Sequence, residues 1–84
     1  MTIDEIRQAN PGFVYIKQEK QWEGKNVYEV IERGEHEDYQ AGNIPEVDIG
    51  GPPVLILEDE NGETRRVTTS SEKVAIARGI GLLI

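Results

Sequence analysis

Residues 54–69 read VLILEDENGETRRVTT, and this stretch decides the fold that we expect for the chain. An apolar run leads into Asn61-Gly62, and a run of Thr and Val residues leads away from it. Asn-Gly between two β-prone runs is the strongest short-range signal for a hairpin, because a tight primed turn needs positive φ at both central residues. The sequence therefore predicts two antiparallel strands joined at Asn61-Gly62.

Two registers are open for this hairpin. If Asn61 and Gly62 alone form the loop, Ile56 faces Val67, and an acid faces a base nearer the turn. If a type I turn starts one residue earlier and Gly62 becomes a bulge, Leu55 faces Val67 instead. The two-residue loop is preferred because it satisfies an apolar pair and an ionic pair together. The choice matters, since a slip of one residue exchanges the core face of a strand with its solvent face.

The first third of the chain predicts a short helix and a second hairpin. Thr2 to Glu5 fits a capping box, and Asn10-Pro11-Gly12 ends the helix after about residue 9. The runs FVYI and VYEVIE are β-prone, so we expect them to pair as a hairpin over residues 13–33. A polar turn around Trp22 separates the two strands.

The remaining segments predict a long connection and a second helix. Residues 34–53 are rich in Gly, Pro and acids, which favours an extended connection over regular structure. Residues 69–72, read TSSE, fit another capping box, and a helix over residues 70–78 is preferred to a strand. The apolar end, Gly81 to Ile84, is expected to form an edge strand or to dock in the core.

These elements predict an α+β fold. Its antiparallel sheet of four or five strands is built from two hairpins, with a short helix near each end of the chain. A small SH3-like β-barrel is the alternative. The 84 residues form a single domain with a small core.

The composition excludes several classes of protein. There is no cysteine, which rules out disulfides, thiolate metal sites and thiol nucleophiles. The N-terminus is too polar for a signal-peptide core, and no apolar run approaches the roughly 18 residues of a membrane span. We expect a soluble, cytoplasmic protein.

Acidic residues are concentrated in one third of the chain. The net charge is -7, and residues 35–60 hold eight of the 16 acids and no Lys or Arg. This distribution disfavours direct binding of nucleic acid, because contacts to phosphates need clustered Lys and Arg. It favours a partner protein with a basic surface.

The residues expected to contact this partner are an aromatic residue near a turn and six acids. They are Trp22, Glu35, Glu37, Asp38, Glu58, Asp59 and Glu60. Large aromatic rings in small cores more often fold back on the protein, and for Trp22 this alternative places the ring over Tyr28 or the sheet face.

The sequence predicts no metal, cofactor or catalytic residue. His36 lies among acids, but no Cys or second His completes a soft-metal site. The carboxylates of residues 58–60 flank a turn, where we do not expect the dry pocket that general acid–base catalysis requires. No G-x-S-x-G elbow surrounds any serine. We therefore expect a protein without enzymatic activity.

Two resemblances to known proteins accompany these patterns. The helix, Asn10-Pro11-Gly12, the strand and Val27-Tyr28-Glu29-Val30 follow in an order that resembles a PepSY-type domain over the first third of the chain. In size and acidity the chain is similar to small phage proteins that mimic DNA and inhibit DNA-processing enzymes. Neither resemblance assigns a role to a particular residue.

Two functional hypotheses result. The first is a small acidic protein-binding module that engages a basic surface, with inhibition or nucleic-acid mimicry as one version. The alternative is a structural or assembly subunit that oligomerises or docks through its apolar C-terminal edge, Gly81 to Ile84. The sequence leaves the oligomeric state open.

Overall fold

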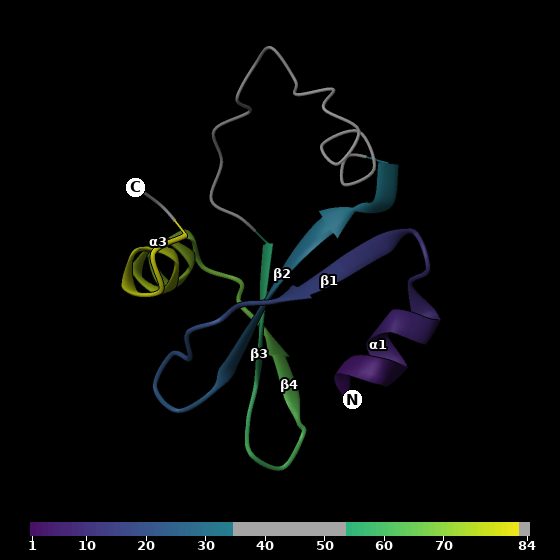
Figure 1. Cartoon of the computed structure of the whole chain (residues 1–84), viewed down its shortest axis with the longest axis horizontal. Coiled ribbons are helices and arrows are strands. Elements are labelled where there is room, and N and C mark those ends of the chain that lie inside the picture. Colours follow the sequence, from purple (N-terminus) through teal and green to yellow (C-terminus); the bar gives the residue numbers. More distant parts are fainter. Residues whose placement is uncertain (35–53, 83–84) are drawn as a thin grey trace.

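A computed structural model describes residues 1–34 and 54–82 of the chain. The elements are α1 (Ile3–Ala9), β1 (Phe13–Lys17), β2 (Asn26–Glu32), β3 (Val54–Glu58), β4 (Thr64–Arg66) and α3 (Ser70–Gly79). The four strands form one antiparallel sheet in the order β1-β2-β3-β4 (Figure 1). This confirms the predicted α+β fold. The sheet is open, so the barrel alternative is wrong.

The two helices begin at the residues that the sequence indicates. Thr2 and Glu5 form the predicted capping box at the start of α1. At the start of α3, the Thr69 hydroxyl accepts from the Glu72 backbone N–H at 3.3 Å. The Glu72 carboxylate does not complete the second box; it accepts from the Arg65 guanidinium at 2.7 Å and ties α3 to β4. Residues 70–79 are helical, so the helix preferred from the sequence is confirmed.

Backbone pairing in the β1–β2 hairpin continues beyond the ends of the two strands. A bridge between Trp22 and Lys25 extends it, with backbone hydrogen bonds of 2.9 and 2.8 Å in the two directions. Glu23 and Gly24 form the loop, and both have positive φ (49° and 77°). Glycine adopts positive φ readily, whereas residues with a side chain, such as Glu23, rarely do.

The preferred register of the β3–β4 hairpin is wrong. Leu57 faces Arg65, and the Val67 N–H donates to the Leu55 carbonyl at 3.0 Å. This is the second register, with a turn that starts one residue earlier and a bulge at Gly62, whose φ is 82°. The bulge places Val67 on the same face as Leu55 and Leu57, where it is fully buried. Burial of a Val side chain outweighs the exposed acid–base pair of the other register.

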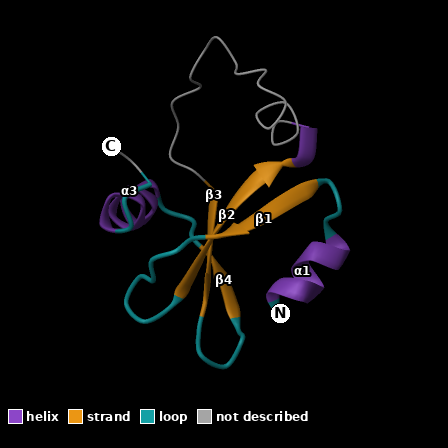
Figure 2. Ribbon diagram, viewed as in Figure 1, coloured by secondary structure: helices purple, strands orange, loops and turns teal. Residues whose placement is uncertain are grey.

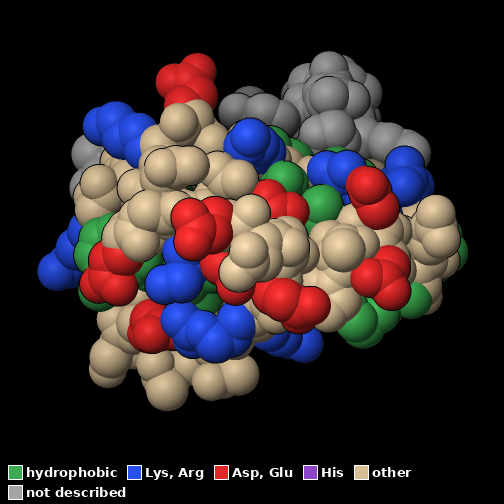
Figure 3. Space-filling model, turned by 90° about the horizontal axis from the view of Figure 1, so that it is seen from below, with side chains coloured by type: hydrophobic (Ala, Val, Ile, Leu, Met, Phe, Trp, Pro, Cys, Tyr) green, Lys and Arg blue, Asp and Glu red, His purple; other side chains and the backbone are tan. Residues whose placement is uncertain are grey.

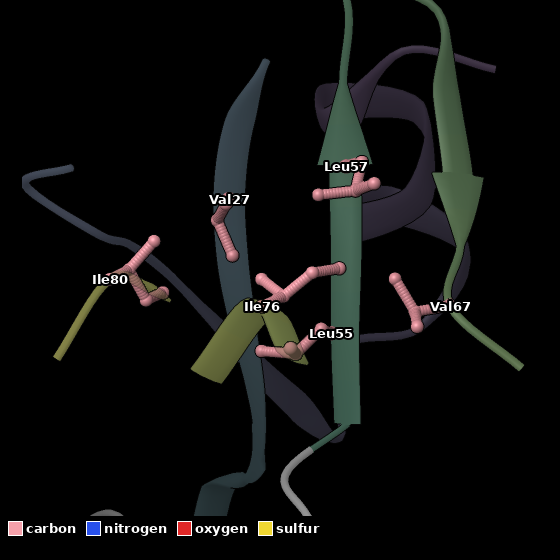
Figure 4. Close-up of a cluster of buried hydrophobic side chains, with 6 residues drawn as sticks. All are labelled: Val27, Leu55, Leu57, Val67, Ile76 and Ile80. Atoms are coloured by element: carbon pink, nitrogen blue, oxygen red, sulfur yellow. The ribbon is translucent and has the colours of Figure 1, made fainter. Parts of the chain in front are cut away.

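The two faces of the sheet carry separate hydrophobic clusters, each covered by one helix (Figure 2). Under α3, the cluster consists of Val27, Leu55, Leu57, Val67, Ile76 and Ile80 (Figure 4). Under α1, it consists of Ile3, Tyr15, Tyr28 and Ile56, with Ile6 and Val30 against it. Side chains alternate between the faces of a strand, so neighbours such as Leu55 and Ile56 belong to different clusters.

Candidate functional site

The turn between β3 and β4 is fixed by the side chain of Asp59. Its Oδ1 accepts from the backbone N–H groups of Asn61 (2.9 Å) and Glu63 (3.0 Å). The backbone of Asp59 also donates to the Glu63 carbonyl at 2.9 Å and accepts from Gly62 at 3.0 Å. Asp59 therefore orders this turn, as Asp side chains commonly do. The arrangement leaves Glu60 and Glu63 exposed at a defined position.

Glu58 connects β3 to β2. Its Oε1 accepts from the Asn26 side-chain amide at 3.0 Å and from the Tyr28 hydroxyl at 3.5 Å. Burial, and after it the Glu58 charge, raises the pKa of the Tyr28 hydroxyl above its usual value. Glu58 is only partly exposed. The Glu58 carboxylate thus already accepts hydrogen bonds within the sheet, and these bonds restrict its rotation toward a partner.

The start of the chain lies beside this turn. The Met1 amino group is 3.2 Å from Glu63 Oε2, and the Thr64 hydroxyl donates to the Met1 carbonyl. Within α1, hydrogen bonds from the Thr2 backbone N–H and then the Thr2 side chain lower the pKa of the Glu5 carboxyl. In the turn, the side chains of Glu58, Asp59 and Glu63 all have hydrogen-bond partners, whereas that of Glu60 has neither a hydrogen bond nor an ion pair with another described residue. It is therefore the member of the turn best placed to meet a partner's cation.

Charge on the described residues is nearly balanced. The chain has 16 acids and 9 bases, and residues 35–53 hold five of the acids and none of the bases. The described residues therefore hold 11 acids and 9 bases, a net charge of -2. Figure 3 views the end of the sheet that carries both hairpin turns, and red and blue side chains are interspersed on it. This end is not a uniformly acidic surface.

Trp22 is packed inside the protein more than the interface hypothesis expects. Its ring lies against the α3 cluster and directly over Gly79. A Cβ atom added at Gly79 would be 2.2 Å from Trp22 Cζ3, so the absence of a side chain there makes room for the ring. The ring does fold back, onto the sheet face that α3 covers, and not onto Tyr28, which lies on the opposite face. Its role in partner contact stays a prediction.

The structure brings together only part of the predicted contact set. Glu58, Asp59 and Glu60 lie at the β3–β4 turn, and Trp22 lies in the neighbouring hairpin at the same end of the sheet (Figure 1). Glu35, Glu37 and Asp38 lie outside the described residues, as does His36. The long connection predicted over residues 34–53 falls there too, apart from Gly34.

The apolar C-terminal edge is partly used by the domain itself. The Leu82 N–H donates to the Ala77 carbonyl at 2.8 Å, and its side chain packs against the α3 cluster. Gly81 has a φ of 79°, which turns the chain back toward α3. Leu83 and Ile84 lie outside the described residues. The described part of this edge packs on its own domain, and the assembly role of Gly81 to Ile84 stays a prediction.

A groove on the α1 side of the sheet was not predicted. It has a volume of about 310 Å³, near the lower end of the range for ligand sites. It is lined by Ile6, Asn10, Phe13, Tyr15, Val30, Val54, Ile56 and Arg66. These residues come from all four strands and from α1 with its C-cap, so the register of the sheet is needed to bring them together. The one hint in the sequence is the alternation of Phe13 and Tyr15 on one face of β1.

Three features are absent from the described residues. Within residues 1–34 and 54–82, no group of three or more His, Asp or Glu side chains could hold a metal ion. The same ranges contain no buried side-chain polar atom without a hydrogen-bond partner. No helix of the described chain is long and apolar enough to cross a membrane.

No protein-family model, curated protein or solved structure matches the chain. The resemblances to PepSY-type domains and to DNA-mimicking phage proteins therefore rest on sequence features alone.

Proposed function

We propose that the chain is a small non-catalytic protein-binding module of the cytoplasm, whose acidic residues engage a basic surface of a partner protein. The observation that carries this proposal is the turn between β3 and β4. Asp59 orders it through two backbone N–H groups at 2.9 and 3.0 Å, and this holds Glu60 exposed at the tip. A preordered turn costs less conformational entropy on binding than a flexible one.

The charge of the chain supports the same role. Residues 35–60 carry eight acids and no base, and Glu35, Glu37 and Asp38 belong to the proposal through this composition. Such a segment accelerates the encounter with a basic partner through long-range attraction. Competition with nucleic acid for a basic surface is one form that this binding would take.

The first test is capture of partners from a lysate of the source organism on the immobilised protein, followed by elution with increasing salt. Salt should release the specific partner, because screening weakens contacts between exposed charges. Once the partner is identified, Glu60→Gln/Glu63→Gln should weaken binding by about 0.2–1 kcal/mol per charge and slow association.

The matched control is Glu19→Gln/Glu32→Gln, which removes the same charge from two exposed residues that lie neither in the β3–β4 turn nor next to Trp22. It should retain more of the affinity than the first variant. Equal losses in the two variants would mean that net charge alone matters and that the turn is not the contact. A partner that stays bound at high salt, with no loss in either variant, would refute the acidic contact.

A further inference from the structure

The groove beside α1 combines an apolar floor with an exposed aromatic rim. Tyr15 and Ile56 are buried at its base, whereas Phe13 keeps 46 % of its surface exposed. Val30 and Val54 are only partly covered. A small domain gains stability from each apolar side chain that it buries, so leaving Phe13 exposed costs burial that the fold could have used. An exposed aromatic at the rim of an apolar groove is typical of a contact site.

Arg66 adds a cation to this groove. It is exposed on β4 and lines the groove beside Ile56, its cross-strand neighbour. Two neighbouring arginines have carboxylate partners: Arg7 is 3.5 Å from Asp4, and Arg65 is 2.7 Å from Glu72. Arg66 has no ion pair or side-chain hydrogen bond with any residue in the described part of the chain. Its guanidinium is available for a carboxylate from another molecule.

We propose that the groove binds an extended segment of a partner protein that carries an apolar side chain two residues from a carboxylate. The segment lies in the groove between Arg66 on β4 and Phe13 on β1, and so crosses the strands. Its carboxylate lies opposite the Arg66 guanidinium on the groove side. Side chains at i and i+2 of an extended segment share a face, so the apolar residue points the same way as the carboxylate, into the groove.

This ligand is the electrostatic opposite of the one proposed for the β3–β4 turn. The turn would meet cations and the groove an anion, so the two surfaces would bind different partners or different parts of one partner. The alternative occupant of the groove is a second copy of the chain. The experiment below distinguishes this occupant from a partner segment.

The probe is a synthetic peptide, acetyl-Thr-Leu-Thr-Glu-Thr-Leu-Thr-amide, whose Leu and Glu side chains share one face of a strand. Its counterpart replaces Glu by Lys. Each is titrated into the ¹⁵N-labelled full chain while backbone amide shifts are recorded. The acidic peptide should shift the amides of Phe13, Val30, Val54, Ile56 and Arg66. The dissociation constant of the lysine peptide should be about two- to fivefold higher.

Charge reversal sharpens the test. Arg66→Glu should invert the preference, so that the lysine peptide binds better than the acidic one. Arg78→Glu is the matched control, because Arg78 is exposed on α3 and does not line the groove. It should leave the preference for the acidic peptide unchanged.

Three results would overturn the proposal. The first is no shift at the groove with millimolar peptide, and the second is an equal response to both peptides. The third is a set of groove shifts that grow with protein concentration in the absence of peptide. That last result would assign the groove to a second copy of the chain.

Discussion

The two faces of the sheet are built from the same strands but differ in how completely their side chains are buried. On the α3 side, Val27, Leu55, Val67 and Ile76 are all 0 % exposed. On the α1 side, the buried residues keep 6–8 % exposure, and a groove of about 310 Å³ remains open beside them. The helix α3 has ten residues and α1 has seven, so α1 covers less of its face. The α3 face is therefore the better packed of the two, and the α1 face keeps an open groove, which we propose as a contact surface.

The largest expected effect comes from removing the side chain at the centre of the α3 face. Ile76→Ala should lower the free energy of unfolding by about 2–5 kcal/mol, because Ile76 is fully buried and leaves a cavity. Ile6→Ala on α1 should cost clearly less, since Ile6 is only partly buried. Urea unfolding of both variants checks this, and equal losses would break the contrast between the faces.

A smaller effect is expected where Trp22 closes the α3 face. Gly79→Ala should destabilise the protein by about 1–3 kcal/mol, because the new Cβ would collide with Trp22 Cζ3. Alanine is otherwise favoured over glycine in a helix by about 0.5–1 kcal/mol. Combining it with Trp22→Leu should therefore remove the penalty. A double variant that shows simple additivity would mean that the ring does not occupy this space.

The smallest effect concerns Glu29, an acid on the α3 face of β2. Its cross-strand neighbours are Ile16 and Leu55, and burial raises the pKa of its carboxyl. The folded chain therefore binds this proton more tightly than the unfolded chain does. The charged carboxylate costs stability above its raised pKa, and the cost disappears as the pH falls through that pKa toward the unfolded value of about 4.3.

Glu29→Gln should thus stabilise the protein at pH 7 by about 0.5 kcal/mol or less, and the gain should vanish near pH 4. Urea unfolding at the two pH values measures it. Glu32→Gln, at the exposed end of the same strand, should change little at either pH. A variant at Glu29 that is less stable than the parent at pH 7 would contradict the unfavourable burial of this carboxylate.

Local signals in the sequence predict most of the fold. The capping box at Thr2, the N-cap at Thr69 and the two hairpins depend on residues that are close in the chain, and the structure contains all of them. The register of the β3–β4 hairpin was predicted wrongly for a local reason as well. The side chain of Asp59 stabilises the earlier turn, and an argument from cross-strand pairs alone does not include this contribution.

The sites are harder to predict because they depend on long-range contacts. Trp22 reaches α3 only because Gly79 lacks a side chain, and these residues are far apart in the sequence. The groove needs Phe13, Val54 and Arg66 on one face, which follows only from the strand order and the register. The acidic segment has the opposite character: composition identifies it at once, although 35–53 lies outside the described residues.

The contrast between the faces is tested most directly by a paired measurement on Phe13→Ala. The account predicts that the free energy of unfolding changes by less than about 1 kcal/mol, because Phe13 is 46 % exposed. It also predicts that the shifts caused by the acidic peptide at Val54 and Arg66 are strongly reduced. A variant that is destabilised as severely as Ile76→Ala, or that binds the peptide like the parent, would contradict the assignment of this face to recognition.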